Sequence, residues 1–225
     1  MPSISRRDFL TRVAVGGTAL ALPQFLVSAC SDVIGNPTES ATLDLSTDPG
    51  VLNYFYAISQ LQSDFWTRAQ LNRFPGITTA ESTAMVFLFT HTTNQRNWLQ
   101  TYQTFGRVTD VLTFDFSNVD FTNRSTSFGT GIVIQDAASA AYAGGIKYLT
   151  SADNIVLASK LASIAARHSA MVRDFGDLFA GGSTRASFAG DDIIGPTGLE
   201  PAASPTDVIA TLQKYFKTTL SVRGA

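Results

Sequence analysis

Charged and metal-binding side chains are scarce in this sequence. Its 225 residues include only three Glu, two His and one Cys, and charged residues account for 15% of the chain. A single Cys excludes an internal disulfide and any zinc or iron–sulfur site built from several thiolates. Metal centres that need many carboxylate ligands therefore have few candidate residues here.

A strong imbalance of charge is missing as well. The chain has 16 Lys and Arg against 18 Asp and Glu, a net charge of −2, so it lacks the basic surface that attracts nucleic acid. Hydrophobic residues make up 44%, which is enough to bury a large core and too many for a disordered chain. The length suits one domain with extensions. We expect a folded domain with no nucleic-acid partner.

The N-terminal segment resembles a twin-arginine export signal. The sequence SRRDFL at residues 5–10 places Arg6 and Arg7 side by side, followed by an apolar pair. An apolar stretch of 17 residues follows at 13–29, which is short for the ~20 residues that a spanning helix requires. Positive residues before a short apolar run indicate a targeting segment. We predict that residues 1–30 are an export signal or a membrane anchor.

Cys30 is a candidate site of lipid attachment. It ends the sequence VSAC, which resembles a bacterial lipobox, and this resemblance implies a lipid on the sulfur of a new N-terminal Cys. Two alternatives stay open: a small buried thiol, and an uncleaved membrane anchor through residues 8–29. The lipid and the anchor both imply tethering on the periplasmic side of the cytoplasmic membrane. Without residues 1–30 the net charge becomes −4, from 13 basic and 17 acidic residues.

The exported part is organised as a linker, a domain and a short tail. Residues 31–47 are rich in Ser, Thr, Asn, Asp and Pro and are predicted to form the linker. Thr47 is a predicted helix cap with Pro close behind, and Thr78 with Glu81 forms a capping box. The domain covers residues 48–219, and residues 220–225 are the tail. The predicted helices cover residues 48–71, 79–105, 131–149 and 154–179, with a short fifth helix at 205–216.

A long connection separates the second predicted helix from the third. Residues 107–128 mix Phe and Val with Asp, Thr, Ser and Asn, and the alternation at 113–116 suggests an extended crossing with a short strand. Two helices, a long crossing and two more helices form the plan of a ferritin-like four-helix bundle. The predicted fold is therefore all-α, with one long crossover and a short C-terminal helix.

Several segments carry a family resemblance in the right order. The sequence IQDAASAAY at residues 134–142 resembles the third-helix segment of exported bacterial ferritin-like domain proteins. Residues 51–66 are similar to the first helix of that family, and AARH at 165–168 is similar to Glu-Ala-Arg-His in its fourth. FDF at 114–116 and SPTDV at 204–208 resemble its crossover and its final helix. The resemblance spans residues 48–219 and implies the same fold.

The resemblance also identifies the positions at which the family holds metal. Ferritin-like di-iron proteins use one Glu from each of two helices and a Glu-x-x-His pair from each of the other two. No carboxylate occupies the matching positions in this chain, and one imidazole does. These positions hold Ser59 or Gln62 in the first helix, Thr92 to Gln95 in the second, Gln135 in the third, and Ala165 to His168 in the fourth.

Helical spacing indicates that these polar residues face the core, because each lies within an apolar stripe at steps of three and four. Buried carboxylates without a cation would be very unfavourable, whereas amides and hydroxyls hydrogen-bond to one another at lower cost. We expect a neutral, metal-free network around His168, no cofactor and no catalytic activity. Trp66 and Trp98 are expected mostly in the core, with some aromatic side chains at an interface.

Three functions remain open at this point. The first is a structural protein that packs against partner proteins, as an accessory subunit of a larger membrane complex. The second is a metal-binding oxidoreductase or storage protein with an unorthodox site that combines His168 with Asp136, His91 or Asp64. The third is a binding module for a small apolar ligand, which would show as a large pocket beside His168.

Overall fold

A computed structural model describes residues 40–102, 112–177, 194–196, 198–200 and 202–225, all within one unit that spans residues 37–225. The predicted signal residues Arg6 and Arg7 and the lipidation candidate Cys30 lie outside the described residues. So do residues 103–111 at the start of the predicted crossing and residues 178–193.

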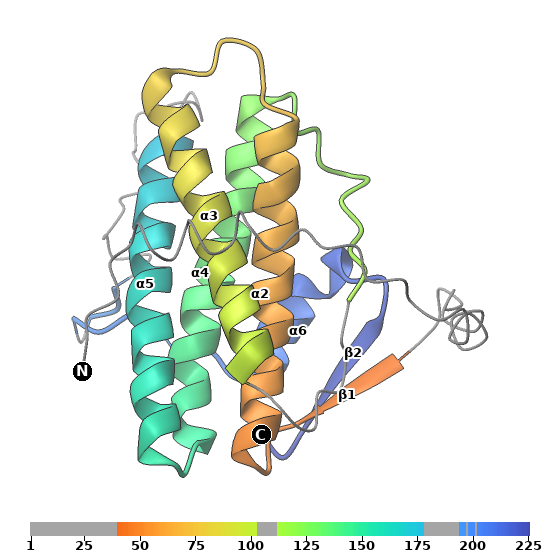
Figure 1. The fold of residues 1–225 in the computed structure, drawn as a ribbon, viewed down its shortest axis with the longest axis vertical. Coiled ribbons are helices and arrows are strands. Elements are labelled where there is room, and N and C mark those ends of the chain that lie inside the picture. The colour runs from red at the N-terminus through yellow and green to blue at the C-terminus, as the bar shows by residue number, and fades with distance from the viewer. Residues whose placement is uncertain (1–39, 103–111, 178–193, 197, 201) are drawn as a thin grey trace, which may run out of the picture. The chain divides into compact units, whose positions relative to one another are not determined.

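Four long helices pack as a bundle: α2 (Asp48–Leu71), α3 (Thr79–Tyr102), α4 (Arg124–Gly145) and α5 (Ala152–Asp177). Helix α2 packs against α3 and α4, and α4 packs against α5. Helices α3 and α4 run in the same direction, as a long crossover requires (Figure 1). The short helix α6 (Pro205–Leu212) packs on α4. These elements confirm the predicted ferritin-like bundle with a short fifth helix.

Local hydrogen bonds explain where the helices begin. Thr47 accepts a bond from the backbone N–H of Gly50, and the Thr78 and Glu81 capping box forms in both directions. The prediction that the third helix spans 131–149 was wrong at both ends. Helix α4 begins seven residues earlier, at Arg124, where Asn123 caps it by accepting bonds from the next turn. At the other end a 3₁₀ turn, η1 (Ile146–Tyr148), follows α4 in place of its predicted last residues. The crossing predicted at 107–128 therefore ends at Asn123.

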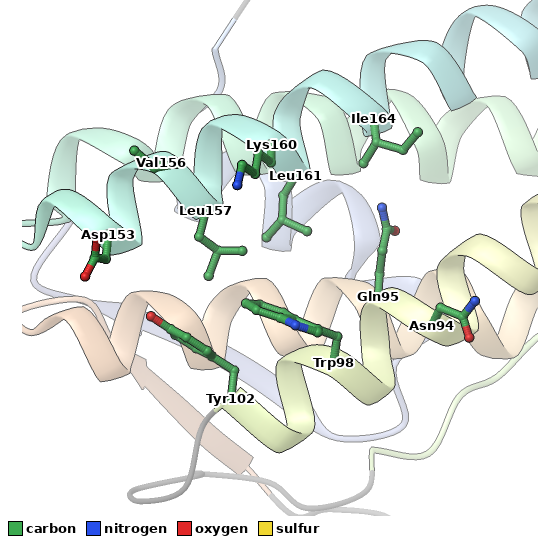
Figure 2. A pocket seen from close by; sticks show the side chains of 10 residues that line it. All are labelled: Asn94, Gln95, Trp98, Tyr102, Asp153, Val156, Leu157, Lys160, Leu161 and Ile164. Atoms are coloured by element: carbon green, nitrogen blue, oxygen red, sulfur yellow. The ribbon is translucent and has the colours of Figure 1, made fainter. Parts of the chain in front are cut away.

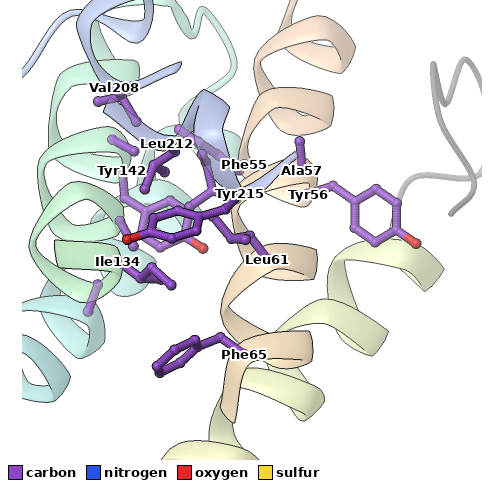
Figure 3. Close-up of a cluster of buried hydrophobic side chains, with 14 of the residues drawn as sticks. Phe55, Tyr56, Ala57, Leu61, Phe65, Ile134, Tyr142, Val208, Leu212 and Tyr215 are labelled. Atoms are coloured by element: carbon purple, nitrogen blue, oxygen red, sulfur yellow. The ribbon is translucent and has the colours of Figure 1, made fainter. Parts of the chain in front are cut away.

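Helix α2 is the centre of the domain. Seventeen of its 24 residues are buried, because α3, α4 and strand β1 (Ser40–Asp44) all contact it. Aromatic rings fill the space on the side of α4 and of the C-terminal segment, where Phe55 contacts Tyr142 edge to face with ring centroids 5.3 Å apart (Figure 3). Each fully buried large apolar side chain contributes about 1.5–3 kcal/mol, so this helix carries much of the hydrophobic stabilisation.

Helices α3 and α5 are the least closely packed neighbours in the bundle. They approach each other at few positions, and a groove lies between them (Figure 2). Among the described residues, α5 is the one helix whose length and composition would suit a membrane span, and 33% of its most apolar stretch is buried. In this fold α5 is a bundle helix with apolar side chains left uncovered on the side of the groove.

A two-stranded sheet corrects the predicted linker and tail. Strand β1 pairs in parallel with β2 (Thr219–Arg223), and Leu43 lies opposite Val222. Part of the predicted linker at 31–47 and most of the tail predicted at 220–225 are therefore folded. The domain begins at least eight residues before the predicted start at residue 48. A short polar strand can be predicted from sequence only when its partner strand is identified, and here the two partners lie on opposite sides of the bundle helices in the sequence. The strand expected at 113–116 is a single bridge between Phe114 and Phe216.

Two glycines provide a matched test of this packing. A Cβ atom on Gly50 would lie 1.6 Å from the carbonyl oxygen of Asp44 at the end of β1, whereas one on Gly129 in α4 meets nothing within 4 Å. We expect Gly50→Ala to lower the free energy of unfolding by about 1–3 kcal/mol through overpacking. Gly129→Ala should raise it by about 0.5–1 kcal/mol through helix propensity. Urea denaturation followed by circular dichroism measures both. Equal effects would contradict the close contact between β1 and α2.

Candidate functional site

Two glutamines and a tyrosine form a neutral cluster in the centre of the bundle. The side-chain amide of Gln62 on α2 donates to Gln135 on α4. The hydroxyl of Tyr142 donates to Oε1 of Gln62 over 2.9 Å. All three side chains are fully buried, and burial raises the pKa of Tyr142 well above its ordinary value. The hydroxyl therefore stays a protonated donor, and the cluster carries no charge.

The other predicted positions on α2, α3 and α5 do not extend this cluster. Ser59 and Thr92 are fully buried. Each donates to a carbonyl of its own helix, Ser59 to Tyr56 over 2.8 Å and Thr92 to Leu88 over 2.7 Å. Such bonds satisfy the hydroxyls locally. Ala165 is buried and has no donor or acceptor in its side chain.

Gln95 departs from the predicted arrangement. It is half-buried and lines the groove between α3 and α5, and its amide makes no hydrogen bond to any described residue. The expectation that it lies near the centre with the other polar residues is wrong. Helix α3 lies far enough from α5 at this level to leave the side chain at the edge of the bundle.

His168 and His91 form a contact between α5 and α3. The Nε2 atom of His168 lies 3.1 Å from Nδ1 of His91, and the two rings stack with centroids 5.3 Å apart. His168 is 3% exposed, whereas His91 is exposed. Burial, and then the neighbouring His91, lowers the pKa of His168 to about 4. The imidazole is therefore neutral at pH 7.

The hydrogen-bond pattern assigns a tautomer to this pair. The Nδ1 atom of His168 is buried and has no partner among the described residues. A bare lone pair there costs less than an unpaired N–H, so we assign the proton of His168 to Nε2, which then donates to His91.

The carboxylates predicted as partners of His168 are paired elsewhere. Asp136 accepts a bidentate pair of bonds from Arg173, one of them over 3.0 Å, and another from Ser169. Asp64 pairs with Arg68 on its own helix over 2.7 Å. Of the three predicted partners, only His91 reaches His168. Within the described ranges, no three His, Cys, Asp or Glu side chains gather as a metal would require.

Two glutamates with described positions also serve the packing. Glu81 forms an ion pair with Arg124 at the start of α4. Burial disfavours its ionisation, but bonds from Thr78 and Arg124 outweigh burial and lower its pKa. Glu200 accepts a bond from Ser139. The donors at the di-iron positions are thus amides, hydroxyls and one imidazole. They do not fit a centre whose ions need carboxylate bridges.

Comparison with known proteins agrees with this architecture. The model of a family described as "Ferritin-like domain" matches residues 47–176, more than half of the chain. The chain belongs to the ferritin-like domain family. The matched range covers the four long helices of the bundle. No curated protein matches the chain.

The exposed aromatic pair on α3 of this ferritin-like domain was not predicted from the sequence. Trp66 is fully buried as expected, but Trp98 is 46% exposed and Tyr102 is 42% exposed, which corrects the expectation that Trp98 lies in the core. The two rings stack beside each other on α3 with centroids 4.7 Å apart. The spacing of four residues between two large aromatic side chains was the available signal, but it does not tell a core stripe from a groove wall.

The pKa of His168 predicts a pH dependence of stability. The unfolded chain takes up a proton near pH 6.5, whereas the folded chain does so only near pH 4. Stability is therefore highest above pH 6.5 and falls as the pH drops through this window, by about 3 kcal/mol at most. His168→Gln should flatten the slope between pH 6.5 and 4 in urea denaturation. His91→Gln, at the exposed partner, should keep most of it. An unchanged slope in His168→Gln would show that His168 is not buried in the neutral form.

Proposed function

We propose that this ferritin-like domain protein is a non-catalytic structural or interaction protein, tethered to the periplasmic face of the cytoplasmic membrane. The observation that carries the proposal is the hydrogen-bonded set of Gln62, Gln135 and Tyr142. Gln62 and Gln135, which stand where the family places metal ligands, bond to each other, and Tyr142 donates a second bond to Gln62. A fully buried neutral network supports packing and offers neither a general base nor an anionic ligand.

The tether rests on the N-terminal sequence. Arg6 and Arg7 with the following apolar run favour export, and Cys30 favours a lipid on the sulfur, with an uncleaved anchor through residues 8–29 as the alternative. A domain held at a membrane surface and lacking a reactive centre suits an accessory subunit of a larger membrane complex. Its partners would then be other proteins of that complex.

A metal-binding role is the second candidate, and one observation favours it. The Nδ1 atom of His91 and the Nε2 atom of His168 face each other at 3.1 Å, and His91 opens to solvent. Two imidazole nitrogens on neighbouring helices are the only part of the expected unorthodox site that comes together. Catalytic zinc sites use three protein ligands, so this pair alone is a weak site.

Metal analysis decides between the two candidates. We expect the full-length protein, expressed in iron-supplemented medium and purified without chelator, to contain far less than one iron or manganese per chain. Elemental mass spectrometry measures the ratio. A stoichiometric metal that is lost in both His91→Ala and His168→Ala, but kept in the control Asp64→Asn, would replace the structural proposal with the metal-binding one.

Cell fractionation tests the tether. The wild-type protein is expected in the membrane fraction, accessible to protease added outside the cytoplasmic membrane. The double variant Arg6→Lys with Arg7→Lys should accumulate in the cytoplasm, because export depends on the arginine pair. The intact mass of the mature protein reports whether residues 1–29 are removed and whether Cys30 carries a lipid. Cys30→Ser should then release the protein only if the lipid is the tether.

Recovery of the wild-type protein from the cytoplasm, with no effect of the arginine substitutions, would contradict the proposed location. Arg73→Lys with Arg167→Lys is a matched control that changes two exposed arginines of the domain and leaves the signal intact.

A further inference from the structure

The groove between α3 and α5 is closed at both ends by side-chain contacts. At one end His91 meets His168. At the other end the hydroxyl of Tyr102 donates to Oδ1 of Asn154 over 2.9 Å, and Nδ2 of Asn154 donates to Asp48 over 2.7 Å. Between these contacts the helices part and leave a cavity of about 660 Å³ that is open to solvent (Figure 2). Eleven residues of helix separate His91 from Tyr102, which corresponds to about 16 Å.

The end at Asn154 is firmly held. Asp48 also accepts bonds from the backbone and side chain of Thr150 and from the backbone of Ser151. Burial disfavours the ionised form of Asp48, but these bonds outweigh burial and lower its pKa to about 2. These bonds hold the start of α5 against the start of α2, and the bond from Tyr102 joins the end of α3 to Asn154 in the same group.

One wall of the cavity is aromatic and the opposite wall is aliphatic. The rings of Trp98 and Tyr102 are inclined by only 19° to each other and are stacked, and together they form an aromatic shelf on α3 (Figure 2). Leu157 and Leu161 of α5 point toward this shelf (Figure 2). Large aromatic side chains that stay half-exposed beside an apolar wall are unusual on a protein surface and mark binding sites.

Polar donors stand at the middle and edge of the cavity. The amide of Gln95 reaches into the gap, and the ammonium group of Lys160 lies at its rim (Figure 2). Neither has a hydrogen-bond or ion-pair partner in the described part of the chain. Arg167 lies in an adjoining hollow that shares Lys160 and Ile164. Asp153, at the far end, is the one acidic residue among the described residues that line the cavity.

We propose that the groove binds a flat, mainly aromatic small molecule that carries an anionic oxygen group such as a carboxylate. Its rings would stack on Trp98 and Tyr102, and its oxygens would accept bonds from Lys160 and Gln95. The volume lies within the range of small-molecule sites. A partner helix or a second copy would need a groove open along its length, whereas these ends are closed. The inference is independent of the proposed membrane tether.

The experiment uses 8-anilinonaphthalene-1-sulfonate, a fluorescent probe that is aromatic and anionic, with the full chain. Calorimetry and fluorescence titration should give one saturable site per chain. Trp98→Ala should weaken binding at least tenfold, because it removes most of the shelf. The neutral analogue N-phenyl-1-naphthylamine should bind less tightly than the probe to the wild type. Lys160→Gln should abolish this preference for the anion.

Matched controls lie outside the groove. Leu71→Ala removes an apolar side chain that is 77% exposed at the end of α2, and Lys147→Gln removes an exposed cation. Both should leave probe binding within twofold of the wild type. Circular dichroism checks that Trp98→Ala is folded. If this variant does not fold, Lys160→Gln, which changes an exposed residue, tests the site in its place.

Other outcomes overturn the proposal. Non-saturating binding, or equal binding by Trp98→Ala, Leu71→Ala and the wild type, would show that the probe does not use the groove. A dimer in sedimentation velocity that Trp98→Ala dissociates would make a second copy the occupant. Equal affinity for the anionic and neutral probes in the wild type would remove the anionic group from the inference.

Discussion

The burial of α2 on all sides between Gly50 and Ser63 is the constraint on which the rest of the structure depends. A stretch of helix that is surrounded by α3, α4 and β1 cannot leave a polar side chain to water. Its central Gln62 must therefore be satisfied by side chains of the neighbouring helices, and Gln135 and Tyr142 of α4 provide the partners. The same burial requires Gly50 where β1 crosses the helix. At the centre of the domain, close packing thus determines which side chains must hydrogen-bond to one another.

The centre of the bundle is neutral, and the side chains that could bind a ligand lie on the side where α3 faces α5. There the two imidazoles meet, Gln95 and Lys160 keep free donors within the described structure, and Trp98 with Tyr102 leaves aromatic surface exposed. The carboxylates that were expected beside His168, Asp136 and Asp64, are paired with arginines instead. The side chains with unused hydrogen-bonding or stacking capacity therefore lie at one edge of the described bundle, beside a neutral centre.

Much of the fold could be predicted because helix signals are local. Thr47, Thr78 and Ser204 begin helices through bonds to residues three positions away, so these caps can be recognised from the neighbouring sequence. Asn123 was overlooked as a cap because apolar Phe and Val residues around it favoured an extended crossing. The pair β1 and β2 could not be predicted, because Ser40–Asp44 gains its partner from residues about 180 positions away. The burial of Gln135 and His168 followed from spacing, whereas the displacement of Gln95 did not.

The sequence by itself determined the helices, the order of the bundle and the identity of the neutral residues at the metal-ligand positions, since these depend on residue type and short-range spacing. Only the tertiary structure decided which polar residues meet. It joined Gln62 to Gln135, turned Asp136 toward Arg173, brought His91 to His168 and left Trp98 beside an open groove. The physical reason is that a helical stripe fixes the direction of a side chain, but the distance between two helices depends on the whole set of contacts between them.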